Sequence, residues 1–210
     1  MKNLFLIRHG ESMQNTKENQ KILLPDHKVY LTENGIIQAE EAGKFLRTYI
    51  DRREIDLENS SLYISPFKRT RDTAKIINGY LGIKEVLEDY LLVEHEYGLF
   101  SDKDFDAIKE LFPEEWEYNL RFYNNEGSFY LRFPMGESPM DVAIRTRMFL
   151  NQLENNDKDN IFIVSHGTAL KTLIMNKMHY SPEWYAHTPN LENCEIRLIN
   201  EKNKMKTLRK

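Results

Sequence analysis

The sequence lacks the features that mark secreted, membrane-bound and nucleic-acid-binding proteins. Its 210 residues include one cysteine, Cys194, so no internal disulfide can form and a reducing, cytoplasmic setting is expected. No apolar run approaches the roughly 20 residues that cross a membrane, and the run Leu4–Ile7 is too short for a signal-peptide core. The net charge of −4 argues against a general nucleic-acid binder. We expect no membrane or nucleic-acid partner, and the oligomeric state stays open.

Motifs for nucleotide and metal chemistry are also missing. The chain contains neither Gly-x-x-x-x-Gly-Lys-[Ser/Thr] nor Gly-x-Gly-x-x-Gly, the loops that cradle nucleotide phosphates. It contains no His-Glu-x-x-His and no paired Cys-x-x-Cys, so no metal site has a motif behind it. Neither nucleotide binding of these types nor a metal site is therefore supported by a motif.

What the sequence does contain is one pattern that occurs three times. A short apolar run, typical of a buried strand, ends in a polar motif and is followed by a helical stretch. Strands that alternate with helices predict a single α/β domain over residues 1–210, a three-layer α/β/α sandwich with a mostly parallel central sheet. The three pairs are Leu4–Ile7 with Arg8-His9-Gly10, Leu62–Ile64 with Ser65-Pro66 and Arg69, and Ile161–Val164 with Ser165-His166-Gly167.

Helix starts are marked by capping residues. Thr32 can cap a helix that runs to about Ile50, and Ser65-Pro66 and Ser138-Pro139 have the N-cap and first-turn signature of two more. The buried stripe of the first helix is expected to contain Ile36, Ala39, Ala42, Gly43, Leu46 and Ile50. The buried face of the third helix is expected to contain Val142, Thr146, Phe149 and Leu153.

Two segments have other patterns. Cys194–Ile199 alternates in polarity and predicts a final strand at a sheet edge, followed by a solvated basic tail that includes Lys202 and Arg209. Residues 99–135 are rich in aromatics mixed with charge, and we predict a small helical insertion that caps the sheet edge. Its aromatic residues are Phe100, Phe105, Phe112, Trp116, Tyr118, Phe122, Tyr123, Phe129, Tyr130 and Phe133.

The polar motifs at the strand ends have the residue types that phosphoryl transfer needs. Ligands of such sheets bind beyond the carboxyl ends of the strands, so these residues are expected to converge. Arg8 and Arg69 offer two guanidinium forks for an anion, and His166 offers a third donor at a helix start. His9 is the candidate nucleophile, and its other ring nitrogen should donate to a backbone carbonyl.

A general acid must protonate the leaving oxygen. Glu94 and Glu96 follow the apolar run Leu91–Val93, and burial of either carboxyl would suit it to this task. The spacing does not choose between them. Further residues with weaker claims to substrate contact are Tyr97, Asn15, Arg121 and Lys68.

Four motifs in this order make the chain resemble the histidine phosphatase superfamily, in its phosphoglycerate mutase-like branch. The resemblance spans residues 4–200, and some stretches are similar to a fungal and plant group of mutase-like phosphatases. The motifs are Arg8-His9-Gly10-Glu11-Ser12 with Asn15, the stretch Ser65–Ala74, Gly136-Glu137-Ser138, and Ser165-His166-Gly167.

The resemblance implies a covalent phosphohistidine on His9 in a pocket of Arg8, Arg69 and His166, with Asn15 close by. It selects Glu94 as the acid, because the family's glutamate lies four residues before a glycine, and it implies no metal or cofactor. The expected activity is hydrolysis of a small phosphate ester. The alternatives are a phosphoglycerate mutase and a phosphate-binding module without turnover.

Overall fold

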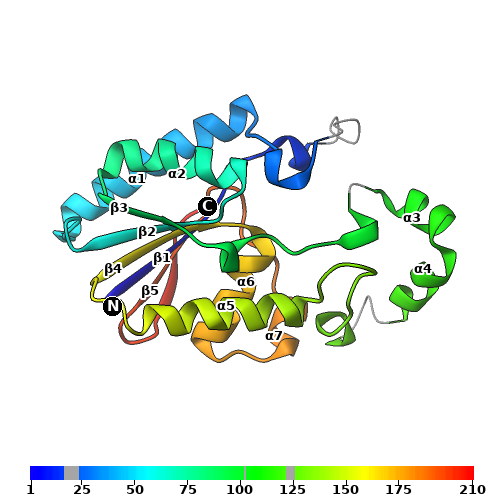
Figure 1. The fold of residues 1–210 in the computed structure, drawn as a ribbon. Coiled ribbons are helices and arrows are strands. Elements are labelled where there is room, and N and C mark those ends of the chain that lie inside the picture. Colours follow the sequence, from blue (N-terminus) through cyan, green and yellow to red (C-terminus); the bar gives the residue numbers. More distant parts are fainter. Residues whose placement is uncertain (17–23, 102, 122–125) are drawn as a thin grey trace.

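A computed structural model describes residues 1–16, 24–101, 103–121 and 126–210. Its centre is a six-stranded sheet of order β3-β2-β4-β1-β5-β6, in which β1, β2, β3 and β4 are parallel and β5 and β6 are antiparallel to their neighbours. The prediction of a mostly parallel sheet is confirmed (Figure 1). The strands are β1 (Asn3–Arg8), β2 (Ser60–Ile64), β3 (Glu85–Glu88), β4 (Asn160–Ser165), β5 (Ile196–Asn200) and β6 (Met205–Arg209).

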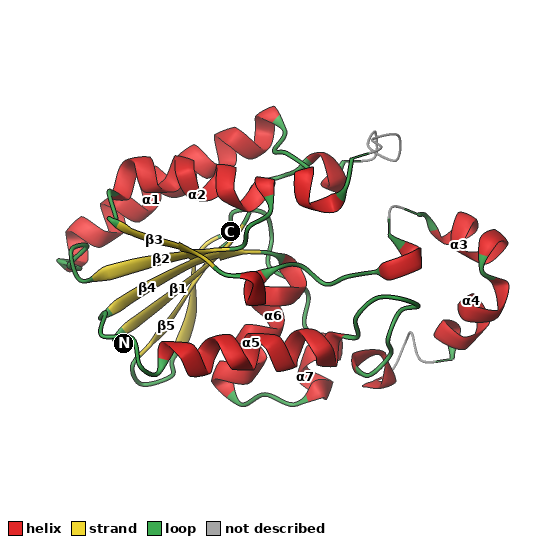
Figure 2. Ribbon diagram, in the orientation of Figure 1, coloured by secondary structure: helices red, strands yellow, loops and turns green. Residues whose placement is uncertain are grey.

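Helices cover both faces of the sheet, so the fold has three layers. Figures 1 and 2 show α1 (Glu33–Arg53) and α2 (Lys68–Leu81) on one face, with α5 (Pro139–Leu153) and α6 (Gly167–Met178) on the other. The short α7 (Pro182–His187) lies beside α6. Within the described residues, none of the helices has both the length and the apolar character that crossing a membrane requires.

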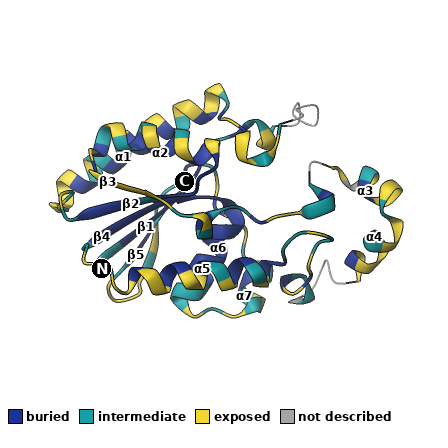
Figure 3. Ribbon diagram, viewed as in Figure 1, coloured by how far each residue is buried: buried dark blue, intermediate teal, exposed yellow. Residues whose placement is uncertain are grey.

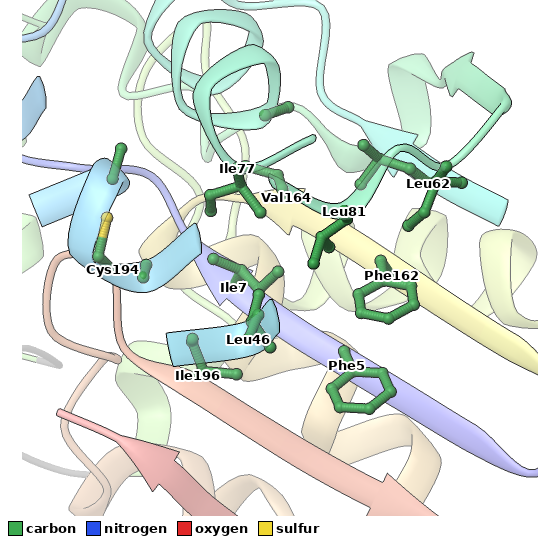
Figure 4. Close-up of a cluster of buried hydrophobic side chains, with 14 of the residues drawn as sticks. Phe5, Ile7, Leu46, Leu62, Ile77, Leu81, Phe162, Val164, Cys194 and Ile196 are labelled. Carbon is green, nitrogen blue, oxygen red and sulfur yellow. The ribbon is translucent and has the colours of Figure 1, made fainter. Parts of the chain in front are cut away.

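Two apolar clusters hold the layers together, because successive strand side chains point to opposite faces. Phe5 and Ile7 pack toward α1 and α2, and the Phe5 and Phe162 rings stack with centroids 4.4 Å apart (Figure 4). Leu4 and Leu6 pack toward α5 and α6. The central strands are buried on both faces (Figure 3), which explains why they appear in the sequence as unbroken apolar runs.

Two of the three predicted helix starts are confirmed. The Thr32 side chain accepts a hydrogen bond from the Gly35 amide at 2.9 Å, and Ser138 caps α5 in a capping box with Asp141. The prediction for Ile36 was wrong, because its side chain is 42% exposed. Gly35 is buried in its place, where a Cβ would overlap the carbonyl oxygen of Glu11.

The helix start predicted at Ser65-Pro66 lies later in the chain than expected. Helix α2 begins at Lys68 with Phe67 as N-cap, so Ser65 does not cap it. The Ser65 hydroxyl lies 2.8 Å from a ring nitrogen of His166 instead. Because the Ser65 hydroxyl bonds His166, the residue after β4, it is not available to cap α2.

The strand predicted over Cys194–Ile199 is confirmed as β5, but it is neither the last strand nor an edge strand. β5 lies between β1 and β6, and the segment expected to be a solvated tail forms β6. The Arg209 side chain donates to the Cys194 carbonyl and to Glu41, which ties the basic end to the sheet and to α1. β3 was not predicted because all its residues are exposed, so no apolar run marks it.

The insertion lies to one side of the three layers (Figure 1). It contains η5 (Gly98–Phe100), α3 (Phe105–Leu111), α4 (Pro113–Leu120) and η6 (Glu126–Phe129). Phe100 is 7% exposed, and its ring packs against Phe133 with centroids 5.5 Å apart. Its role as a cap stays a prediction, and residues 102 and 122–125, with Phe122 and Tyr123, lie outside the described residues.

Candidate active site

A cavity of about 350 Å³ lies where the strand-end motifs meet. Arg8, His9, Arg69 and Glu94 all line it, although they come from three separate stretches of the chain. His166 is not among the residues of the wall, but its ring centroid lies 5.2 Å from that of His9. The other residues of the wall are Gln14, Asn15, Asp26, His95, Glu96, Tyr97, Phe100, Ser101, Lys103, Thr168 and Asn190.

His9 follows β1 directly and is 3% exposed. Its Nδ1 donates to the Gly10 carbonyl at 2.7 Å, the backbone partner expected from the sequence. The proton therefore sits on Nδ1, and Nε2 has a free lone pair. Burial, with the charges of Arg69 and Arg8, lowers the pKa of His9 well below the ordinary value of 6.5. The ring is therefore neutral at physiological pH, as a nucleophile requires.

Gly10 makes this geometry possible. A Cβ at position 10 would overlap the Gly35 carbonyl oxygen, so the chain after β1 passes against the start of α1 more closely than a side chain allows. The Gly10 amide donates to the Thr73 hydroxyl at 3.0 Å, which joins the same turn to α2.

His166 is the N-cap of α6 and is completely buried. Its Nε2 lies 2.8 Å from the Ser65 hydroxyl, and its Nδ1 has no hydrogen-bond partner. Burial, with the charges of Arg69 and others nearby, lowers the pKa of His166 well below 6.5. When the Ser65 hydroxyl donates to Nε2, the single ring proton of neutral His166 is on Nδ1.

The two arginines are held by backbone and carboxylate oxygens. Arg69 is 2% exposed, and its Nη1 donates to the Asp26 carbonyl at 2.8 Å and to Asp26 Oδ1 at 2.7 Å. Its Nη2 lies 3.3 Å from Asp26 Oδ2. Arg8 Nη1 donates to the Leu191 carbonyl, and burial lowers the pKa of Arg8. The Nε atoms of both arginines have no partner.

Unpartnered buried donors are concentrated at this site. In the described part of the chain, the buried side-chain polar atoms without a partner are Arg8 Nε, Arg69 Nε, His166 Nδ1 and the Asn119 oxygen. Three of these four atoms are nitrogens around His9. Because buried polar groups are nearly always hydrogen-bonded, such a group of free donors is typical of a site built for an acceptor-rich anion.

The Glu94 carboxylate contacts the start of α6. Its Oε1 accepts from the His95 amide at 2.9 Å and the Ala169 amide at 3.2 Å, and its Oε2 from the Thr168 amide at 3.3 Å. Since His166 is the N-cap of the same helix, this contact brings the carboxylate close to His166, and Glu94 lines the same cavity as His9. Glu96 also lines the cavity, but no hydrogen bond joins it to α6 in the described contacts.

The weaker candidates divide into two groups. Asn15 lines the cavity and its oxygen accepts from the Ser12 amide at 3.0 Å, and Tyr97 lines it with its ring 4.7 Å from that of His95. Lys68 and Arg121 are not in the wall. Lys68 pairs with Asp72 at 2.8 Å on the exposed side of α2.

Sequence reasoning missed Asp26, Gln14, Lys103 and Asn190. Gln14 and Asp26 lie in short 3-10 helices and Lys103 and Asn190 in loops, and their place in the wall depends on how distant segments fold together. As for metals, no group of three or more His, Cys, Asp or Glu side chains within the described ranges is arranged to hold an ion.

Comparison with known proteins identifies the family. The sequence pattern of the histidine phosphatase superfamily (branch 1) matches residues 4–210. The chain belongs to the histidine phosphatase superfamily. The four motifs seen in the sequence are thus part of a match over nearly the whole chain.

Two relatives of this histidine phosphatase superfamily member have mutase names. It is 33% identical to phosphoglycerate mutase-like protein AT74 of Arabidopsis thaliana, over 94% of this chain and 64% of the plant protein. It is 30% identical to probable phosphoglycerate mutase GpmB of Erwinia tasmaniensis, over 95% of this chain and 85% of that protein. It therefore spans a little under two thirds of the plant protein's length.

The same fold occurs in solved structures. The alpha-ribazole phosphatase of Shigella flexneri matches with a TM-score of 0.77 and 22% identity, over 99% of this chain and 96% of that one. At this identity the match shows a shared fold, which agrees with the three-layer arrangement described above.

Proposed function

We propose that the protein is a phosphomonoester phosphatase that forms a covalent phosphohistidine on His9. One observation carries this proposal: Arg8 Nε, Arg69 Nε and His166 Nδ1 are buried without acceptors around a neutral His9 with a free Nε2. Three oxygens of a phosphoryl group would supply those acceptors. A nucleophile and an anion site at one point favour transfer over simple binding.

The first step transfers the phosphoryl group to the enzyme. His9 Nε2 attacks phosphorus and forms the N–P bond while the P–O bond to the leaving group breaks. Arg8, Arg69 and His166 stabilise the charge on the transferring oxygens. Glu94 gives its proton to the leaving oxygen, which departs as an alcohol.

The second step returns the enzyme to its starting state. Water attacks phosphorus, its proton passes to Glu94, and the N–P bond breaks to release inorganic phosphate. His9 regains its lone pair and Glu94 its proton, so one ester and one water become one alcohol and one phosphate. No metal or cofactor takes part in this scheme.

The substrate we propose is a small phosphorylated metabolite. The cavity of about 350 Å³ is at the small end of ligand pockets, and its wall is mostly polar. Asn15 and Tyr97 are in place to contact the leaving group. We place the reaction in the cytoplasm, since Cys194 is a free, buried cysteine, and without a nucleic-acid partner, since the net charge is −4.

The trapped intermediate tests the proposal. The wild-type protein, mixed with a 32P-labelled phosphomonoester and quenched in base, should retain label as acid-labile, base-stable phosphohistidine. His9→Ala should retain none and should lose at least about 10³-fold in turnover, since covalent catalysis is removed. Phosphate release by His9→Ala at the wild-type rate would contradict the mechanism. A wild type that binds phosphate but releases none from any ester would be a binding module.

A mutase is the second candidate, favoured by the 30% identity to probable phosphoglycerate mutase GpmB. A mutase returns the phosphoryl group from His9 to a bound phosphoglycerate, whereas a phosphatase gives it to water. Incubation with 3-phosphoglycerate and a trace of bisphosphoglycerate separates the two activities. Free phosphate as the main product supports the phosphatase, and isomerisation without phosphate release supports the mutase.

A further inference from the structure

The segment after Glu94 and the segment around Glu137, which flank the insertion, are joined by hydrogen bonds. The Glu137 amide donates to the Glu96 carbonyl at 2.8 Å, and the Glu96 amide donates to the Glu137 carboxylate at 3.1 Å. His95 Nε2 lies 2.8 Å from the Glu137 carbonyl, so it donates there. A Cβ on Gly136 would overlap the Glu96 carbonyl oxygen, which shows how closely the two segments approach.

Arg145 of α5 forms hydrogen bonds to both of these segments. Its Nη1 donates to the carbonyls of Leu91 at 2.9 Å and Val93 at 2.7 Å, and its Nη2 to the carbonyl of Glu94 at 3.0 Å. Its Nε and Nη2 also form a bidentate pair with the Glu137 carboxylate at 2.8 and 3.0 Å. These contacts account for all five N–H donors of the guanidinium.

Neither Arg145 nor Glu137 lines the cavity, so neither is placed to touch the substrate. Their side chains are 13% and 21% exposed. Every hydrogen bond described for the two side chains ends on residues 91–96 or on the other partner. Fixing three carbonyls around Glu94 sets where its carboxylate stands between the cavity and α6. A displacement of about 1 Å in such a group can cost roughly 10²-fold in rate.

We propose that Arg145 and Glu137 are positioning residues for Glu94, and that they serve protonation of the leaving group without contributing to phosphate binding. The proposal rests on the phosphatase function above. It also gives a role to the Gly136-Glu137-Ser138 motif, which the sequence singled out without a chemistry.

Leaving-group dependence separates this role from a purely structural one. A nitrophenolate leaves without a proton, whereas an alkoxide needs the acid. The test compares kcat/KM for p-nitrophenyl phosphate and for an alkyl ester, glycerol 2-phosphate. Glu137→Gln preserves shape, and Arg145→Lys preserves the charge that helps lower the pKa of His166. Glu94→Gln is the benchmark, and Arg147→Lys, on the exposed side of the same helix, is the control.

Glu137→Gln and Arg145→Lys should lose about 10- to 100-fold in kcat/KM for the alkyl ester and under about threefold for the aryl ester. Glu94→Gln should show the same difference between the two esters. The inhibition constant of inorganic phosphate should stay within about twofold of wild type, since the donors to phosphate stand on other elements. Equal losses on both esters, or weaker phosphate binding of the same size, would overturn the proposal. A wild type that hydrolyses neither ester would instead refute the proposed function.

Discussion

The Asp26 carboxylate holds one edge of the Arg69 guanidinium and leaves the other edge without a partner. Asp26 contacts Nη1 twice and Nη2 once, whereas Nε has no acceptor. The free edge, Nε with the remaining Nη2 hydrogen, is a fork that matches two phosphate oxygens. Asp26 therefore orients a buried arginine, 2% exposed, so that its free edge could receive an anion.

Removing this anchor should weaken phosphate binding. Asp26→Asn replaces one carboxylate oxygen with a donor that faces Arg69, and we expect the inhibition constant of phosphate to rise about tenfold, or ~1.4 kcal/mol. Asp72→Asn, which breaks the exposed pair with Lys68, is the control. Competitive inhibition assays measure both. Tighter phosphate binding by Asp26→Asn would mean that Asp26 competes with phosphate for Arg69.

Ser65 should matter for catalysis through the tautomer of His166. Its hydroxyl lies 2.8 Å from Nε2, and when it donates to this nitrogen the ring proton is on Nδ1. Ser65→Ala should lower kcat about 10-fold and destabilise the protein by about 1–3 kcal/mol, because a buried nitrogen loses its partner. Ser61→Ala, at a buried serine of β2, the strand that precedes Ser65, provides the comparison and should leave kcat unchanged. Steady-state kinetics and urea unfolding measure the two effects, and an unchanged kcat in Ser65→Ala would contradict this role.

Acid should destabilise the ligand-free protein. Burial lowers the pKa of both His9 and His166 below 6.5, so in the folded state they stay neutral where unfolded histidines bind protons. Their contribution to stability is present above about pH 6.5 and is lost as the pH falls below it, by up to ~1.4 kcal/mol per pH unit for each histidine.

Thermal midpoints between pH 7.5 and 5.5 test this linkage. The slope against pH should be shallower in His166→Gln and unchanged in His187→Gln, which removes an exposed imidazole. Saturating phosphate should reduce the slope, because the anion favours protonated histidine. A flat profile in the wild type would contradict the inferred shifts.

Two glycines should respond in opposite ways to alanine. Gly98 has φ of 55°, and a Cβ there would overlap the Pro134 carbonyl oxygen. Gly98→Ala should therefore lower the free energy of unfolding by at least about 2 kcal/mol and loosen the segment from Glu94 to Gly98. Gly79 lies in α2 with open space around it, so Gly79→Ala should stabilise by about 0.5–1 kcal/mol. Chemical denaturation of both variants measures the difference, and stabilisation by Gly98→Ala would contradict the strain argument.

Predictions from the sequence were reliable where a residue's role depends on a single helix or strand. The apolar runs of β1, β2 and β4 were visible because both faces of these strands are buried, and Thr32 and Ser138 were visible as caps because capping is a contact within a few residues. β3 gave no signal because its side chains are all exposed, and β6 because it alternates with charge. Ser65 misled because its hydroxyl bonds a residue 101 positions away.

The sequence by itself determined the sheet's core strands, the chemistry at their ends and the family, because these depend on residue type and on spacing along the chain. Only the tertiary structure decided that Asp26 orients Arg69 across 43 positions, that Glu94 stands against α6, and that Arg145 fixes the Glu94 loop. The physical reason is that hydrogen bonds between distant segments depend on how the layers pack. No local pattern encodes which carboxylate reaches which guanidinium.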